Sequence, residues 1–155
     1  MKRFLTVLMA FTLLTGVSLY AQNPSKIALA MGELEKKYNE TKGMDCMTFT
    51  KGKGLEMIKM VLNKELGKTF MKGVTSVTII DYSEASEQVC QSFNKDLDVI
   101  TTQLKELGTE GEKRGTRSFA CTSNVDAGKL SDFIIVMEGD GKKTMMYMAG
   151  CIAVE

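Results

Sequence analysis

The sequence predicts an α+β domain with a largely antiparallel sheet of about five strands and three helices packed mainly on one face of that sheet. Three segments carry apolar residues at intervals of three and four, which is the spacing of an amphipathic helix. Five short segments are rich in β-branched and aromatic residues, as strands are. The last two of them flank GDGK, residues 139–142, a sequence typical of a hairpin turn. The expected order is α-β-α-β-α-β-β-β, and consecutive strands favour antiparallel pairing.

The first half of the chain contains two of the predicted helices and two of the strands. Ile27, Met31 and Leu34 recur at helical spacing and predict the first helix. The run VTSVTIIDY is dense in β-branched residues and predicts a well-buried strand. The elements expected here are a helix over 25–42, a strand over 44–50, a helix over 55–66 and a strand over 74–82.

The second half begins with the most regular apolar pattern in the chain. Its apolar residues step by four, four, three, four and three, and they are Val89, Phe93, Leu97, Ile100, Leu104 and Leu107. This pattern predicts one long helix that starts at Ser83 or Ser86 and ends before Gly108. The segments after it predict strands over 117–123, 130–138 and 143–154.

Residues 1–21, MKRFLTVLMAFTLLTGVSLYA, have the pattern of a secretory signal peptide. Lys2 and Arg3 precede an apolar run that is too short to span a membrane, and the residues leading to Ala21 are small or neutral. We therefore predict export to the periplasm or cell envelope, with cleavage near Ala21. The remaining chain, 22–155, is expected to form a single α+β domain without a transmembrane segment.

The charge of the processed chain limits the kinds of partner that it can bind. Removing Lys2 and Arg3 from the 20 basic residues leaves 18 against 19 acidic residues, a formal net charge of −1. A chain this close to neutral is not built for nucleic acid or for an anionic membrane surface. The predicted partner is therefore another envelope protein or a second copy of the chain, and no cofactor is expected.

The stretch TMMYMAGCIAV, residues 144–154, carries three methionines and a cysteine and no charge. Read with a period of two, Met146 and Met148 point to one face and Met145 and Tyr147 to the other, which is typical of a central strand. Thioethers are also ligands that Cu(I) selects, but the chain has no histidine to complete such a site. A core strand is the favoured interpretation, and a partner-binding surface or a soft-metal site are the alternatives.

The absence of histidine excludes several classes of enzyme. It removes Ser-His-Asp and Cys-His catalysis and the common zinc sites. A hydrolase that uses two carboxylates would have Asp45, Asp81, Glu84 and Glu87 as its candidates. Acidic residues in the first turn of a helix are, however, the ordinary complement of the helix dipole. The sequence therefore predicts no enzymatic activity, with a carboxylate-based hydrolase as the third alternative.

The four cysteines are even in number, which in an exported chain permits disulfides in any of three pairings. They are Cys46, Cys90, Cys121 and Cys151, and none of them is part of a CxxC motif. All four can equally be buried free thiols, which pack as small hydrophobic side chains. Both interpretations stay open.

Most of the chain after the signal peptide is similar to one protein family. The run EKKYNETKGMDCMTFTKGKGLEMIKMVLNKELGKTFMKGVTSVTIIDYSEAS, the cysteine-bearing helix after it and the closing SDFIIVMEGDGKKTMMYMAG resemble small exported proteins of unknown function from Bacteroidetes. The most specific parts are MDCMTFTKGKG and VTSVTIIDYS. The resemblance implies a cell-envelope location and an α+β fold, and it brings no catalytic or ligand residues.

These observations together predict a non-enzymatic exported protein of the cell envelope. Its role would be that of a protein-interaction module, or of a module for sensing or assembly. The alternative is a periplasmic protein that binds a small ligand or a soft metal, with Met146 and Met148 on the strand that would hold the ligand or contact a partner.

Overall fold

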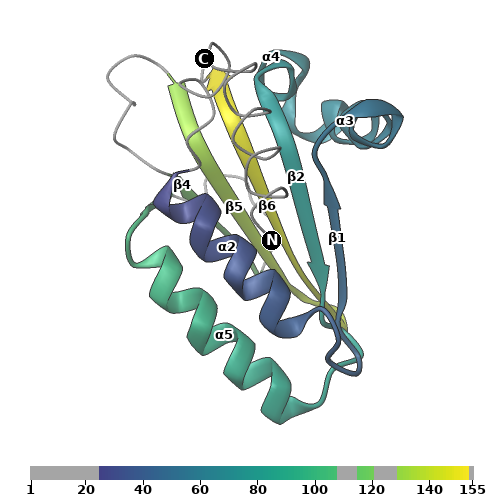
Figure 1. Cartoon of the computed structure of the whole chain (residues 1–155), viewed down its shortest axis with the longest axis vertical. Coiled ribbons are helices and arrows are strands. Elements are labelled where there is room, and N and C mark those ends of the chain that lie inside the picture. Colours follow the sequence, from purple (N-terminus) through teal and green to yellow (C-terminus); the bar gives the residue numbers. More distant parts are fainter. Residues whose placement is uncertain (1–24, 108–114, 121–128, 154–155) are drawn as a thin grey trace, which may run out of the picture.

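The computed structural model describes residues 25–107, 115–120 and 129–153 of the chain, and these residues form one six-stranded sheet with helices on both faces (Figure 1). The strand order is β1-β2-β6-β5-β4-β3, and all five neighbouring pairs are antiparallel. The elements in chain order are α2 (Lys26–Tyr38), β1 (Asp45–Phe49), α3 (Gly52–Leu66), α4 (Lys68–Lys72), β2 (Val74–Asp81), α5 (Glu87–Thr101), β3 (Lys105–Leu107), β4 (Thr116–Ala120), β5 (Lys129–Gly139) and β6 (Lys142–Ala153).

The α+β class and the antiparallel sheet are confirmed, whereas two counts differ from the prediction. The described sheet has six strands, because the three-residue strand β3 pairs with β4 at the edge opposite β1. The described helices number four, because Gly67 interrupts the helical run after Leu66 and the short helix α4 follows it. Gly67 has φ +88°, a value that few residues other than glycine adopt.

The long helix predicted to reach Leu107 ends at Thr101 instead. The hydroxyls of Thr101 and Thr102 donate to the carbonyls of Asp98 and Val99, three residues back, where they compete with continuation of the helix. Leu104 lies in the turn after α5 and still packs against the apolar cluster that contains Phe93 and Leu97. It therefore keeps the spacing of a buried helical residue without being in the helix. Leu107 lies in β3, opposite Ser118.

The predicted hairpin between β5 and β6 is confirmed. Gly139 pairs with Lys142, so that Asp140 and Gly141 form a two-residue loop. Both loop residues have positive φ, at 52° and 76°, as a type I′ turn requires. The hairpin places β6 between β5 and β2, in the middle of the sheet.

The first face of the sheet is covered by α2 and α5, which lie side by side in Figure 1. Met145 and Tyr147 of β6 point to this face and pack in the same cluster as Leu34 of α2 and Phe93 of α5. The rings of Tyr38 and Phe93 meet edge to face at 5.2 Å between centroids, joining the two helices. This layer is the larger part of the core.

The second face of the sheet carries its own apolar cluster, and this corrects the prediction that the helices pack mainly on one face. Met146 and Met148 of β6 point to this side, where Leu55 of α3 and Met71 of α4 are buried with them. The cause is the composition of the central strand, which is apolar on both faces and therefore needs cover on both.

A buried carboxyl group fixes the start of α2 to the first face of the sheet. The Asp132 side chain is inaccessible to solvent and accepts hydrogen bonds from the hydroxyls of Ser25, Ser131 and Tyr147, each at 2.7 Å. Ser25 is also the N-cap of α2, where its Oγ accepts from the backbone N–H of Ala28. One hydroxyl thus joins the helix cap to the sheet.

Candidate interaction surface

The strand β1 forms one edge of the sheet and offers an open row of backbone groups. It pairs with β2 from Asp45↔Asp81 to Phe49↔Val77, and no other described strand pairs with its outer side. Figure 1 shows it as the outermost strand, with α3 at the end where Phe49 lies. Proteins commonly block such an edge with charged side chains, especially lysine, or with proline, and the charged residue of DCMTF is Asp45 at its first position. No other described strand therefore prevents a further strand from pairing with residues 46–49.

The helix α3 presents apolar side chains on two opposite sides. Its inner side packs on the second face of the sheet through Leu55, which is buried. Its outer side carries Met57, Met60 and Val61, which are 64%, 67% and 63% exposed. These three positions are three and four residues apart, so they share one helix face. A helix that is apolar on both sides ordinarily has a neighbour on both sides.

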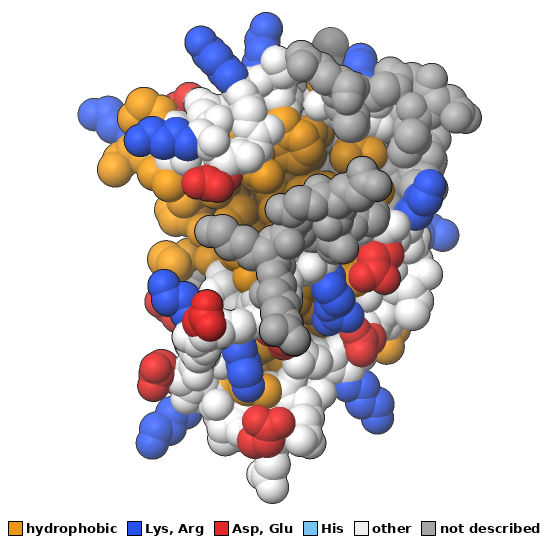
Figure 2. Space-filling model, turned by 180° about the vertical axis from the view of Figure 1, so that it is seen from behind, with side chains coloured by type: hydrophobic (Ala, Val, Ile, Leu, Met, Phe, Trp, Pro, Cys, Tyr) orange, Lys and Arg blue, Asp and Glu red, His pale blue; other side chains and the backbone are white. Residues whose placement is uncertain are grey.

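An apolar hollow lies between the end of β1 and α3. Its volume is about 680 Å³. Its lining residues are Phe49, Gly54, Met57, Ile58, Met60, Val61 and Lys64. Seen from behind, Figure 2 shows apolar side chains over the sheet, with lysines around the end of the molecule that α3 and α4 occupy. The hollow thus combines an apolar lining with a basic rim.

The charge at this end of the molecule is strongly positive. Residues 51–72 contain six lysines and two glutamates, a net charge of +4, whereas the whole chain carries +1. The remainder of the chain is therefore −3. Lys51 and Lys53 lie at the start of α3 beside the end of β1, and both are exposed. The side chains of Met57, Met60 and Val61 with these lysines are called the α3 surface below.

A second hollow, of about 700 Å³, lies at the other end of β1 and is acidic. Its lining residues are Gly43, Met44, Asp45, Asp81, Ser83, Glu84, Gly141, Lys142 and Thr144. Asp45 and Asp81 are cross-strand partners, and the Asp81 carboxylate accepts from the Ser83 N–H at 2.9 Å. Three of the four predicted hydrolase candidates are thus brought together. The fourth, Glu87, instead lies 3.8 Å from the ammonium of Lys143.

This acidic hollow has no arrangement that holds a metal ion. Among the described residues, no group of three or more Asp, Glu, Cys or His side chains is placed to bind one. Carboxylates that line one hollow have the residue types of a hydrolase site. The same group of carboxylates is equally suited to receive lysine side chains.

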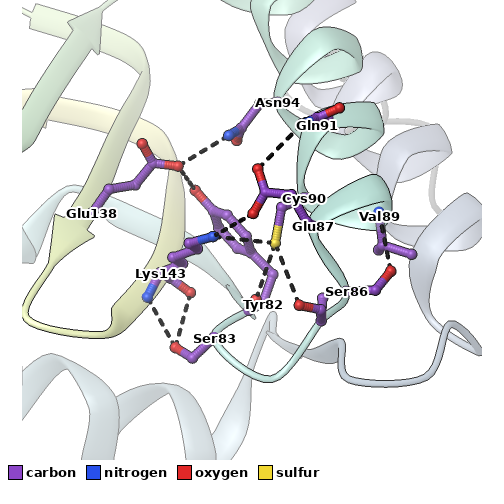
Figure 3. A network of polar contacts seen from close by, with 11 residues as sticks. Tyr82, Ser83, Ser86, Glu87, Val89, Cys90, Gln91, Asn94, Glu138 and Lys143 are labelled. Carbon is purple, nitrogen blue, oxygen red and sulfur yellow. Dashed lines mark hydrogen bonds and ion pairs between the residues drawn. The ribbon is translucent and has the colours of Figure 1, made fainter.

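A polar network closes the end of the molecule where α5 begins (Figure 3). The hydroxyl of Tyr82 and the amide of Asn94 both donate to Glu138 Oε1, at 2.9 and 3.0 Å. Lys143 Nζ lies 3.5 Å from the sulfur of Cys90, whose thiol in turn contacts the carbonyl of Tyr82. Burial first, and then the bond to Glu138, raise the pKa of Tyr82 above its usual range. The network therefore holds a neutral phenol and ties the hairpin to α5.

The two methionines that the sequence singled out lie together in the core, and the three described cysteines lie on three different elements. Met146 and Met148 are buried in the core of the second face. Cys46 is half-buried on β1, Cys90 is buried on α5 and Cys151 is exposed on β6, all three as free thiols. Cys121 lies outside the described residues. Burial, followed by Glu35 and Asp45, raises the pKa of Cys46 to about 11.

Sequence reasoning missed the outer side of α3. The stripe assigned to that helix was Leu55, Ile58, Leu62 and Leu66, which the structure places on the inner side. A second stripe at positions 57, 60 and 61 was visible in the same twelve residues, LEMIKMVLNKEL. Two apolar stripes on one short helix were the available signal.

No protein-family model, curated protein or solved structure matches this chain. Of the helices that the structure describes, none combines the length and the hydrophobicity that crossing a membrane requires.

Proposed function

We propose that the chain is a non-enzymatic protein of the cell envelope that works by binding another protein there, either an envelope protein or a second copy of itself. Export of the mature chain after cleavage near Ala21 belongs to the same proposal. The observation that carries it is the α3 surface, where three large apolar side chains stand about two-thirds exposed beside an open sheet edge.

An uncovered apolar surface of this kind costs free energy that a partner recovers. Fully burying a Val or Met side chain contributes roughly 1.5–3 kcal/mol, so covering Met57, Met60 and Val61 from their present exposure contributes about 1–2 kcal/mol each. Apolar side chains grouped around a hollow and bounded by charged residues are typical of the centre and rim of a protein interface. The neighbouring β1 edge adds backbone hydrogen bonds to that interface.

Site-specific photocrosslinking in the intact envelope tests this proposal. A photoreactive residue replaces Met57, and the same residue replaces Val99 in the control chain. Val99 lies on α5 and is 64% exposed, so it matches Met57 in exposure but lies on the other face of the sheet. We expect a discrete protein adduct from position 57 and none from position 99. An absence of adducts at 57, or the same adducts at both positions, would contradict the proposal.

A small-ligand carrier is the second candidate, and the volume of the apolar hollow favours it. About 680 Å³ lies within the range of ligand pockets. An apolar fluorescent probe would then bind the purified protein with one site, and Met60→Lys would abolish that binding. The soft-metal form of this candidate has less support, because Met146 and Met148 are packed among other core side chains.

A further inference from the structure

We infer that the protein on the α3 surface is a second copy of this chain, joined antiparallel along β1 about a two-fold axis. The inference rests on the function proposed above and names the partner of that site. The pairing would continue the sheet from one copy into the next and place the basic end of each β1 edge against the acidic end of the other.

The geometry of the β1 edge suits pairing with a second copy of itself. Antiparallel pairing of two identical strands is generated by a two-fold axis perpendicular to the sheet. With Met47, the central residue of β1, at that axis, Asp45 of one copy lies opposite Phe49 of the other. The same rotation keeps equivalent sheet faces on the same side. The helices α2 and α5 of both copies therefore stay on the first face.

The second argument is charge complementarity along that edge. One end of β1 carries Lys51 and Lys53, with Lys64 on the rim of the apolar hollow. The other end carries Asp45 and Glu84, which line the acidic hollow. Antiparallel pairing brings the lysines of each copy to the carboxylates of the other, twice per dimer. Parallel pairing of the same edges would set like charges against each other, which is unfavourable.

The third argument concerns the exposed apolar side chains. Asp45, Met47 and Phe49 alternate onto the second face of the sheet, the face on which α3 lies. In Figure 1, α3 extends outward past β1. With Met47 at the axis, the chain beyond Phe49 of one copy lies next to the Asp45 end of the other, so α3 of each copy would lie at that end of its partner. Met47, which is 41% exposed, would be covered by its own counterpart.

The test is the oligomeric state of the processed full-length protein, measured by sedimentation equilibrium up to about 100 μM. The first variant carries Lys51→Glu and Lys53→Glu, and the second carries Asp45→Lys and Glu84→Lys. All four side chains are exposed, so the folded monomer should tolerate each change. We expect a wild-type dimer, at least about tenfold weaker association of each variant alone, and recovery when the two variants are mixed.

A second readout uses the residue at the axis. In a Cys151→Ser background, which removes the one exposed thiol among the described cysteines, Met47→Cys should form an intermolecular disulfide under mild oxidation, since paired antiparallel strands place opposite Cα atoms about 4.5–5.5 Å apart. Val99→Cys in the same background should not. In the sedimentation experiment, recovery of the dimer on mixing also shows that both charge-reversal variants are folded.

Several results would overturn the inference. They are a wild-type monomer at the highest concentration, a dimer that both charge reversals leave unchanged, and variants that fail to recover on mixing. A monomeric chain whose position 57 still captures a different envelope protein overturns the second copy as the partner and leaves the proposed function standing. Vesicle binding by the monomer, in place of dimer formation, overturns both.

Discussion

Replacing Tyr147 with phenylalanine should destabilise the protein by removing one of the three hydroxyls that hold Asp132. The Asp132 side chain is completely buried, and Tyr147 donates to its Oδ1 at 2.7 Å. Ser25 donates to the same oxygen at the same distance. Because no water reaches this carboxyl group, nothing replaces the lost donor. The buried Oδ1 atom of Asp132 then accepts one hydrogen bond fewer, which destabilises the folded state.

The size of the effect follows from that burial. Removing a hydrogen-bond partner from a buried polar group costs about 1–3 kcal/mol, and the substitution itself leaves little empty volume. We therefore expect Tyr147→Phe to lower the free energy of unfolding by about 2 kcal/mol. In a domain of this size, that loss corresponds to a fall in Tm of roughly 5–10 °C.

The matched control is Tyr38→Phe, since Tyr38 is also buried and also donates to a carboxylate, Asp96 Oδ2, at 2.6 Å. The Asp96 side chain is 33% exposed and also binds the ammonium of Lys37. Water can therefore replace the tyrosine hydroxyl, and we expect a loss below about 1 kcal/mol. Urea denaturation of both variants measures the difference. Equal losses, or a loss under about 0.5 kcal/mol for Tyr147→Phe, would refute this reasoning.

Two further predictions concern glycines and thiols. Gly73→Ala should lower the free energy of unfolding by at least about 2 kcal/mol in urea denaturation, because the new Cβ would lie 2.0 Å from the carbonyl oxygen of Cys151. The control is Gly32→Ala in α2, whose new Cβ meets nothing within 4 Å and which should stabilise the protein by about 0.5–1 kcal/mol. A small loss for Gly73→Ala would contradict the packing of α4 on β6. At pH 8, a disulfide reagent should modify Cys151 well before Cys46, because a pKa of about 11 leaves the Cys46 thiol almost wholly protonated. Mass spectrometry measures the two modification rates, and equal rates would contradict the raised pKa of Cys46.

The elements that the sequence predicted well are those whose burial pattern has one period throughout. The strand β6 alternates as expected, with Met145 and Tyr147 on one face and Met146 and Met148 on the other. The turn between β5 and β6 was readable because an Asp-Gly pair suits two positive φ values. Local chemistry was sufficient for both features.

The features that were missed depend on where segments meet in space. The spacing of Leu104 continues the helical pattern of α5, and only its packing in a turn distinguishes it from a helical residue. Similarly, the three carboxylates of the acidic hollow come from the start of β1, the end of β2 and the turn after β2. Their proximity follows from the β1–β2 register, which a single sequence does not specify.

The distribution of charge shows why a net value close to zero says little about a binding surface. Near neutrality shows that the chain is not uniformly basic, and the expectation that it does not bind nucleic acid stays a prediction. The value of −1 for the processed chain, however, is the sum of +4 over residues 51–72 and −5 elsewhere. When the two signs lie at opposite ends of one open edge, the surface is complementary to a rotated copy of itself. Near neutrality of the whole chain also favours self-association, because two chains of small net charge repel each other little.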